Sequence, residues 1–188
     1  FRNFTIFEEE ENKIIKKVCR YQQFRAVNKT LEKLKRREGG IIWHTQGSGK
    51  SLTMLYMGLK LKRELGNPNL VYITDRIDLD EQLHGTFTRC GFPNPEHAGS
   101  CEDLRQQLKD KQGLTILTTI HKFAKGEEHF PLTEDPNVYV LVDEAHRSQY
   151  KGYAANMRMA LPEAVLIGFT GTPIDKKDKS TARVFGKY

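Results

Sequence analysis

Short, nearly continuous apolar runs alternate along the chain with longer stretches in which apolar residues recur at helical spacing. The apolar runs predict buried strands at residues 41–43, 70–74, 114–118, 138–142 and 164–169. The stretches with helical spacing predict helices at residues 14–34, 52–61, 104–108 and 152–161. Strands that are apolar throughout are typical of sheets buried on both faces. The pattern therefore predicts an α/β fold, with a mostly parallel sheet between two layers of helices.

Local signals refine the ends of these elements. Asp78 and Glu81 have the spacing of a capping box, which predicts the start of another helix. Ser100 is expected to cap the helix that contains residues 104–108. Residues 91–95 are expected to form a loop between these two helices.

The N-terminal stretch is expected to differ from the rest of the chain. Residues 1–17 contain an acidic run at residues 8–11, and they are expected to form a solvated approach linker from an upstream domain. Residues 18–188 are expected to form one domain, because a chain of this length suits a single core of ordinary to large size.

A glycine-rich loop separates the first apolar run from the next helical stretch. Gly47 and Gly49 allow successive backbone N–H groups to point at an anion. The helix N-terminus that follows favours negative charge, and Lys50 brings a full positive charge to the β- and γ-phosphates of a nucleotide. Strand, loop and helix in this order predict a P-loop, although His44 occupies the place of the first glycine in the general pattern. The predicted nucleotide-binding residues are Thr45, Gln46, Gly47, Ser48, Gly49, Lys50 and Ser51.

Two carboxylates follow the most apolar of the predicted strands. Asp143 is suited to hold a Mg²⁺ ion together with the Ser51 hydroxyl. Glu144 is suited to orient the water that attacks the γ-phosphate. Since ligands bind at the carboxyl ends of parallel strands, both carboxylates are expected beside the phosphates. With Lys50, they are the predicted catalytic residues of a hydrolase that uses ATP and Mg²⁺.

Composition narrows the class of protein. The chain has 188 residues, a net charge of +6 and three cysteines. The positive charge is compatible with a polyanionic partner, and the cysteines have neither metal-ligand spacing nor an even number for a disulfide framework. No apolar run approaches the roughly 20 residues of a membrane-spanning helix, and no secretion signal is present. A cytoplasmic protein without a membrane partner is expected.

The motifs resemble those of superfamily 2 helicases and translocases. Residues 45–51, 143–146 and 168–173 are similar to motifs I, II and III of these enzymes, in the same order. Residues 20–23 resemble the upstream motif in which a glutamine reads adenine, since a glutamine amide can pair with the N6 and N7 edge of that base. Gln23 is the expected adenine contact, and Gln22 is the alternative.

Together with residues 74–79, 118–123 and 146–150, these motifs resemble the motor subunit of type I restriction enzymes over nearly the whole chain. The resemblance implies a RecA-like ATPase domain that uses ATP to pull double-stranded DNA past a stationary complex before cleavage at a distance. It also implies specificity and methylation subunits as partners in a prokaryotic cytoplasm. Contacts with the DNA backbone are implied for Thr74, Arg76, Thr118, Thr119, His121 and Lys122. The residues implied to couple ATP hydrolysis to DNA movement are His146, Thr170, Gly171 and Thr172.

The same resemblance implies parts of the enzyme that lie outside this stretch. A metal-dependent nuclease domain is expected upstream, and a second RecA-like lobe with arginine fingers is expected after Tyr188. The 188-residue chain is therefore expected to bind ATP, to hydrolyse it poorly, and neither to translocate nor to cut DNA. Carboxylate-x-lysine sequences at residues 11–13 and 175–177 are interpreted as solvated charge rather than nuclease residues.

Two other interpretations fit parts of the pattern. The first is another superfamily 2 helicase that acts on DNA or RNA, such as a DEAH-type RNA helicase. Those enzymes tend to have Ser-Ala-Thr in motif III, where this chain has Thr170, Gly171 and Thr172. The second is a nucleotide-binding switch module that performs no work on nucleic acid. The presence of Glu144 as a base and the nucleic-acid motifs argue against the switch.

Overall fold

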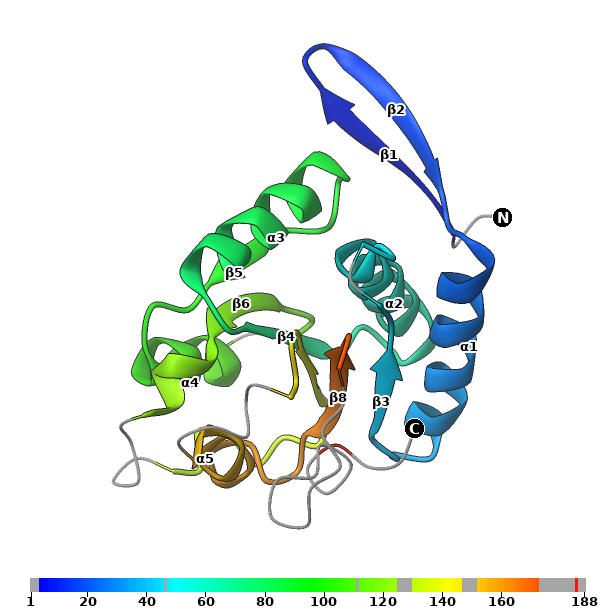
Figure 1. Cartoon of the computed structure of the whole chain (residues 1–188). Helices are drawn as coiled ribbons and strands as arrows, with labels where there is room; N and C mark the ends of the chain where they lie inside the picture. The colour runs from blue at the N-terminus through cyan, green and yellow to red at the C-terminus, as the bar shows by residue number, and fades with distance from the viewer. Residues whose placement is uncertain are drawn as a thin grey trace.

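The computed structural model describes residues 4–45, 47–110, 112–124, 130–146, 152–172 and 185. Within these residues, parallel strands form one six-stranded central sheet (Figure 1). The strands are β3 (Gly40–Trp43), β4 (Asn69–Thr74), β5 (Pro95–His97), β6 (Thr115–Thr119), β7 (Val138–Val142) and β8 (Val165–Thr170). They lie in the order β3-β8-β7-β4-β6-β5. The predicted α/β class and the parallel sheet are confirmed.

Helices cover both faces of the sheet. In the described part of the chain they are α1 (Tyr21–Lys35), α2 (Lys50–Glu64), α3 (Ile77–Arg89), α4 (Cys101–Asp110), α5 (Tyr153–Ala160) and the 3₁₀ helix η1 (Ile120–Ala124). Figure 1 shows α1 and α2 on one side of the sheet and α5 on the other. Leu70 and Tyr72 of β4 pack in the core beneath α1, α2 and α3, whereas Val71 and Ile73 pack with α4 and α5. None of the helices in the described ranges is long and apolar enough to cross a membrane.

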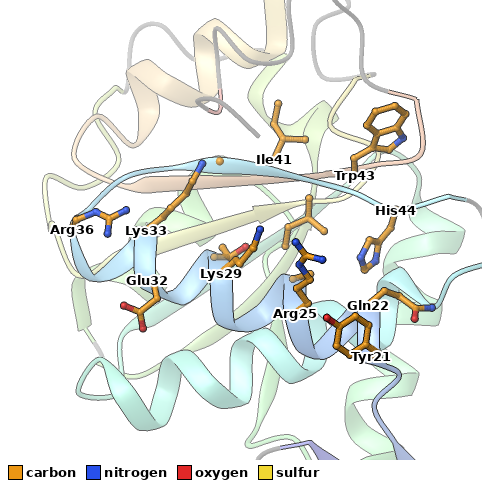
Figure 2. Close-up of a pocket in the computed structure, with 14 residues that line it drawn as sticks. Tyr21, Gln22, Arg25, Lys29, Glu32, Lys33, Arg36, Ile41, Trp43 and His44 are labelled. Carbon is orange, nitrogen blue, oxygen red and sulfur yellow. The ribbon is translucent and has the colours of Figure 1, made fainter.

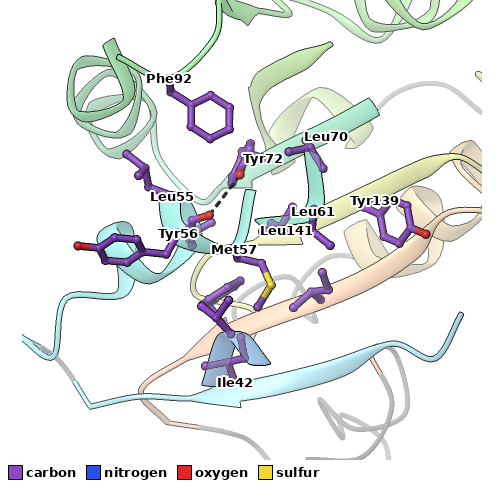
Figure 3. Close-up of a cluster of buried hydrophobic side chains, with 14 of the residues drawn as sticks. Ile42, Leu55, Tyr56, Met57, Leu61, Leu70, Tyr72, Phe92, Tyr139 and Leu141 are labelled. Atoms are coloured by element: carbon purple, nitrogen blue, oxygen red, sulfur yellow. Dashed lines mark hydrogen bonds between the residues drawn. The ribbon is translucent and has the colours of Figure 1, made fainter. Parts of the chain in front are cut away.

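The core beneath α2 buries two tyrosine side chains whose hydroxyl groups are hydrogen-bonded. The Tyr72 hydroxyl donates to the Met54 carbonyl at 3.2 Å (Figure 3). The Tyr56 hydroxyl donates to the Lys17 carbonyl at 3.1 Å, and burial raises the pKa of Tyr56 to about 12. A buried tyrosine is well tolerated when its hydroxyl has such a partner. These bonds hold α2, and with it the loop before its first turn, against β4 and the N-terminal segment.

The N-terminal segment forms a β-hairpin, and the expectation that its acidic run is solvated is wrong for Glu8. The strands β1 (Thr5–Glu10) and β2 (Lys13–Val18) pair antiparallel. Ile6 and Glu8 point toward the domain and are 4% and 2% exposed. Glu8 accepts a hydrogen bond from Arg89 Nε at 3.1 Å and also contacts the Lys17 ammonium. The acidic run therefore contributes a buried carboxylate, because basic partners on β2 and α3 offset the cost of burying its charge.

The helix predicted from residue 14 begins instead at Tyr21. Ile14, Ile15 and Val18 supported the helical spacing, but they lie on β2 with exposed fractions of 76%, 38% and 53%. A short apolar stretch fits both periodicities, so the spacing alone could not separate strand from helix. The division between residues 1–17 and 18–188 stays a prediction.

The capping box predicted from Asp78 and Glu81 is absent. Helix α3 has Arg76 as its N-cap residue, and no side chain makes a capping hydrogen bond there. Asp80 is buried, and its Oδ2 lies 2.9 Å from His97 Nδ1 on β5. The first turn of α3 thus directs a carboxylate inward, to a partner that local sequence does not reveal.

The Ser100 cap is confirmed, because its hydroxyl accepts a hydrogen bond from the Asp103 backbone N–H at 3.0 Å at the start of α4. The edge strand β5 was not predicted. It has three residues, a stretch too short to show a periodicity, and among the described strands it pairs with β6.

Candidate functional site

The loop between β3 and α2 has the backbone shape of an anion-binding P-loop. Gly47 and Gly49 have φ angles of 77° and 83°, in the left-handed region that glycine adopts without strain. The Ser48 backbone N–H donates to the Thr45 carbonyl at 3.2 Å and closes the turn. Gln46 lies outside the described residues. The loop leads directly into the N-terminus of α2, in the predicted order of strand, loop and helix, and nucleotide binding by its residues stays a prediction.

Several polar groups in this loop are available to a ligand. Lys50 and Ser51 form the first turn of α2, where backbone N–H groups have no partner within the helix. Within the described residues, His44 Nδ1 and Ser48 Oγ are buried without a hydrogen-bond partner. Burial and then the charge of Lys50 lower the pKa of His44, so its ring is neutral at pH 7. Buried polar atoms without partners are rare, and these two are consistent with a site built to receive one.

Gln23 braces the loop from α1. Its side chain is 2% exposed. Its Nε2 donates to the Gly49 carbonyl at 3.1 Å, and its Oε1 accepts from the Arg20 backbone N–H at 2.8 Å. Gln22, the alternative, is exposed. Both ends of the Gln23 amide are therefore bound to backbone, and the adenine contact stays a prediction for this pair of residues.

The end of β7 brings the predicted carboxylates to the P-loop. Glu144 Oε1 lies 3.2 Å from Lys50 Nζ, and these side chains are 26% and 11% exposed. Glu144 has a φ of 46°, an unusual conformation for a residue with a side chain. The Asp143 backbone N–H donates to the Ile73 carbonyl at 2.8 Å and holds this turn to β4. A strained backbone of this kind is commonly retained at functional sites.

Asp143 and Ser51 have the chemistry of a Mg²⁺ site. Burial raises the pKa of Asp143, and the hydrogen bond from the Glu144 N–H at 2.9 Å offsets only part of this rise. A cation beside this carboxylate would relieve the cost of its burial. Oxygen ligands suit Mg²⁺, which keeps several waters and phosphate oxygens and needs few protein ligands. No group of three His, Cys, Asp or Glu side chains in the described ranges forms a metal site by itself.

A chain of polar contacts joins the carboxylates to the loop after β8. Glu144 Oε2 lies 3.3 Å from His146 Nδ1, which lies 2.8 Å from Thr170 Oγ1. Thr170 is fully buried, and its hydroxyl also accepts a hydrogen bond from the Thr172 backbone N–H at 3.1 Å. The structure therefore brings together the residues predicted to couple the nucleotide site to motif III. Pro173 and residues 147–150 and 175–177 lie outside the described residues.

These residues surround a cavity of about 420 Å³. Its lining consists of Thr45, Lys50, Asp75, Arg76, Leu79, Asp143, Glu144, His146, Gly171 and Thr172. The cavity combines two cationic side chains with three carboxylates, a charge pattern that suits a phosphate chain with a bound cation. Asp75 and Arg76 were not predicted to face the nucleotide. Their position directly after β4 was the available signal, because ligands bind at the carboxyl ends of parallel strands.

A separate groove of about 630 Å³ lies between α1 and β3 (Figure 2). Arg25, Lys29 and Lys33 of α1 form one wall together with Arg36 at the C-cap of that helix, and β3 forms the other. The groove reaches Gln22 and His44 at one end but contains none of the predicted catalytic residues. The predicted catalytic residues therefore line the cavity of about 420 Å³ and not this groove.

The threonines predicted to contact DNA are buried. Thr74 and Thr119 are paired across β4 and β6, so the two loops lie side by side. The Thr74 hydroxyl donates to the Arg76 carbonyl at 3.1 Å, and the Thr118 hydroxyl donates to the Ala98 carbonyl at 3.0 Å. Two of these hydroxyls thus have partners within the protein.

The basic side chains of the same loops are more accessible. Arg76 and His121 are exposed, and Lys122 is half-buried. The Arg76 guanidinium lies 3.8 Å from Asp78, and the His121 ring packs edge-on against Tyr153 with 5.5 Å between centroids. These side chains are placed to meet phosphate more readily than the threonine hydroxyls, and DNA contact by all six residues stays a prediction.

Proteins with similar amino-acid sequences are named as subunits of type I restriction enzymes. The chain is 45% identical over 217 residues to the type I restriction enzyme HindI endonuclease subunit of Haemophilus influenzae, and the match covers all of the chain and 20% of that relative. It is 42% identical over 186 residues to the putative type I restriction enzyme MjaIXP endonuclease subunit of Methanocaldococcus jannaschii, which covers 91% of the chain and 18% of the relative. The chain thus spans about a fifth of the length of these relatives, and the resemblance to their motor domain is confirmed.

Solved structures share the fold. The Sulfolobus solfataricus SWI2/SNF2 ATPase core in complex with dsDNA matches with a TM-score of 0.64 and 19% identity, over 85% of this chain and 33% of that one. The ATP-dependent Type ISP restriction-modification enzyme LlaBIII bound to DNA matches with a TM-score of 0.65 and 19% identity, over 94% of this chain and 15% of that one. The predicted RecA-like fold, as found in helicase structures, is confirmed.

The sequence pattern of the SWI2/SNF2 ATPase family matches residues 22–188, which include the P-loop, the carboxylates after β7 and the loop after β8. That span holds every residue of the cavity around Lys50. It begins within α1, one residue before Gln23. The chain belongs to the SWI2/SNF2 ATPase family, as a helicase-like, nucleotide-using motor domain.

Proposed function

We propose that the chain is the ATP-hydrolysing motor domain of a type I restriction endonuclease subunit and drives translocation along double-stranded DNA, coupled to remote cleavage. The observation that carries the proposal is the 3.2 Å contact between Lys50 and Glu144, which joins the P-loop to the catalytic carboxylates. The 45% identity to the HindI endonuclease subunit over the whole chain supports the restriction context.

The residues of the cavity divide the chemistry among them. Lys50 and the N–H groups at the start of α2 would bind the β- and γ-phosphates. Ser51 and Asp143 would hold Mg²⁺, which neutralises phosphate charge when bound. Glu144 would orient and deprotonate the attacking water once the phosphates have replaced it at Lys50. Gln23 or Gln22 would recognise the adenine.

DNA binding is supported by the loops at the carboxyl edge of the sheet. Arg76 and His121 are exposed, and they follow the neighbouring strands β4 and β6. The net charge of the chain is +6. Arg76 also lines the nucleotide cavity, so one loop would connect ATP with DNA. Specificity and methylation subunits are the proposed partners, because the relatives are named as subunits of type I restriction enzymes.

The polypeptide that carries this chain would contain further parts, since the relatives are about five times longer. We include a second RecA-like lobe and a nuclease domain among them. Without the arginine fingers of the second lobe, the 188-residue chain would bind ATP and turn it over slowly, because such fingers contribute about 10³–10⁵-fold in related systems. Rapid turnover by the 188-residue chain alone would contradict this part of the proposal.

The experiment is ATP hydrolysis by the full-length polypeptide with its partner subunits. The reactions contain no nucleic acid, RNA, single-stranded DNA, or duplex DNA with and without a recognition site. The proposal requires stimulation by duplex DNA that contains the site. Stimulation by RNA would identify a helicase instead, and equal rates in all reactions would identify a nucleotide switch. Glu144→Gln serves as the control that binds ATP without turnover.

A further inference from the structure

Trp43 occupies a position that core packing does not explain. It is the last residue of β3, and the neighbouring Ile41 and Ile42 are 7% and 6% exposed. Trp43 itself is 62% exposed, although it is the largest side chain of the strand. Its indole N–H donates to the Gly171 carbonyl at 3.0 Å, in the loop that follows β8. A large side chain at the surface with a directed hydrogen bond indicates a role in positioning that loop.

The loop that Trp43 contacts is held from two sides. On the β3 side, the His44 backbone N–H donates to the Thr170 carbonyl at 3.0 Å, next to the Trp43 bond to Gly171. On the β7 side, His146 contacts the Thr170 hydroxyl at 2.8 Å. The β7 side leads through Glu144 to Lys50, and the β3 side leads directly into the P-loop. Both routes start at the phosphate-binding residues and end at residues 170–172.

We propose that Trp43 is a positioning residue through which the nucleotide state of the P-loop sets the position of Gly171. This inference rests on the proposed function, in which residues 170–172 couple ATP hydrolysis to DNA movement. When the loop after β3 closes on phosphates, a shift at the end of β3 reaches Gly171 through the indole N–H. When Lys50 exchanges Glu144 for phosphate, the route through His146 changes at the same time. The two contacts together give residues 170–172 different positions in the empty and nucleotide-bound states.

The first test separates this role from nucleotide binding. Trp43→Phe keeps an aromatic ring and removes the N–H donor. In the full-length protein with its partners, we expect the ATP KM to stay within about twofold and the DNA-stimulated kcat to fall about 2- to 10-fold, the range that one net hydrogen bond corresponds to. Phe7→Leu is the matched control, because Phe7 is also a strongly exposed aromatic, at 57%, but lies on the hairpin. An unchanged kcat in Trp43→Phe, or a KM and thermal midpoint altered enough to explain the loss, overturns the proposal.

The second test uses fluorescence and needs no nucleic acid. Trp43 is the only tryptophan of the 188-residue chain, so the tryptophan emission of this chain comes from Trp43 alone. We expect the emission to shift when Mg²⁺–ATP saturates the Glu144→Gln variant, with saturation verified separately by nucleotide titration. Saturation without any change in emission overturns the proposal. If duplex DNA fails to stimulate the wild-type protein, the proposed function fails, while this measurement still decides the role of Trp43.

Discussion

The ammonium group of Lys50 lies 3.2 Å from the carboxylate of Glu144, and the side chains are mostly shielded from solvent. A bound phosphate chain would compete with Glu144 for the same lysine. Nucleotide binding would thus release the carboxylate toward the attacking water and toward His146, which already lies 3.3 Å from it. The contact between Lys50 and Glu144, which joins the two halves of the site without nucleotide, is therefore the contact that a bound nucleotide would break.

Replacement of Glu144 by Gln tests this relationship. We expect ATP affinity to be equal or higher, because the competing carboxylate charge is removed, and hydrolysis to fall by at least about 10²-fold, because the general base is lost. Nucleotide titration and single-turnover hydrolysis of the full-length protein measure the two effects. Glu163→Gln changes an exposed glutamate and should leave both values unchanged. Hydrolysis at the wild-type rate in Glu144→Gln would show that another group acts as the base.

Gly49→Ala should damage the P-loop more than its backbone strain alone explains. The residue has a φ of 83°, and a Cβ there would lie 2.7 Å from Gln23 Nε2, so the hydrogen bond that braces the loop would be lost. We expect a loss of stability of about 1–2 kcal/mol from the backbone, together with loss of ATP binding. Urea unfolding and nucleotide titration measure these effects.

Gly66→Ala is the matched control for Gly49→Ala. Gly66 has a φ of 73°, and nothing lies within 4 Å of a Cβ placed there. It should show a similar loss of stability while ATP binding is retained. Equal effects of the two substitutions on ATP binding would show that Gln23 does not support the loop.

The hairpin should depend on the charge of Glu8. Burial alone would raise the pKa of Glu8, but Lys17 and Arg89 more than offset this and hold it below its ordinary value of 4.5. The folded state therefore binds this proton more weakly than the unfolded state does. The stabilisation is complete above pH 4.5 and is lost as the pH falls through the lowered pKa. We expect Glu8→Gln to reduce the free energy of unfolding by about 1–3 kcal/mol at neutral pH, since hydrogen bonds to a charged group are removed.

Urea unfolding at neutral and acid pH measures the effect of Glu8→Gln, and the difference from wild type should shrink in acid. Glu9→Gln is the control, because Glu9 lies on the opposite face of the same strand and is exposed. A Glu9 effect as large as that of Glu8 would show that the ion pairs with Lys17 and Arg89 contribute nothing specific.

His44 should make the stability of the domain sensitive to mild acid. Burial and Lys50 lower its pKa below the ordinary value of 6.5. Between the two values the unfolded state binds more protons, so stability rises with pH through this window and falls as the pH drops below 6.5. We expect wild type to lose more stability than His44→Gln on going from about pH 7.5 to about pH 5.5, as measured by urea midpoints. Identical losses would show that His44 is protonated as readily in the folded state as in the unfolded chain.

Periodicity and motif chemistry were sufficient for every strand of the described sheet except β5, and for the residues at the centre of the site. The apolar run at residues 138–142 became β7, and the run at residues 70–74 became most of β4. Such runs are unambiguous because these strands are buried on both faces. The glycine-rich loop and the Asp-Glu pair are local patterns whose chemistry follows from residue type and order. Residues 14–18 were assigned to a helix, because a short exposed strand carries no distinctive period.

The partners of the buried polar side chains were decided only by the tertiary structure. Glu8 was expected in solvent and lies against Arg89, and Asp80, between the residues of the predicted capping box, lies against His97. Trp43 was expected only to end a strand and holds the Gly171 carbonyl. Apolar periodicity reports whether a position is buried, but not which distant residue lies beside it. That choice depends on the order of the strands in the sheet and on how each helix packs across it, because contacts between residues far apart in sequence form only when these elements are in place.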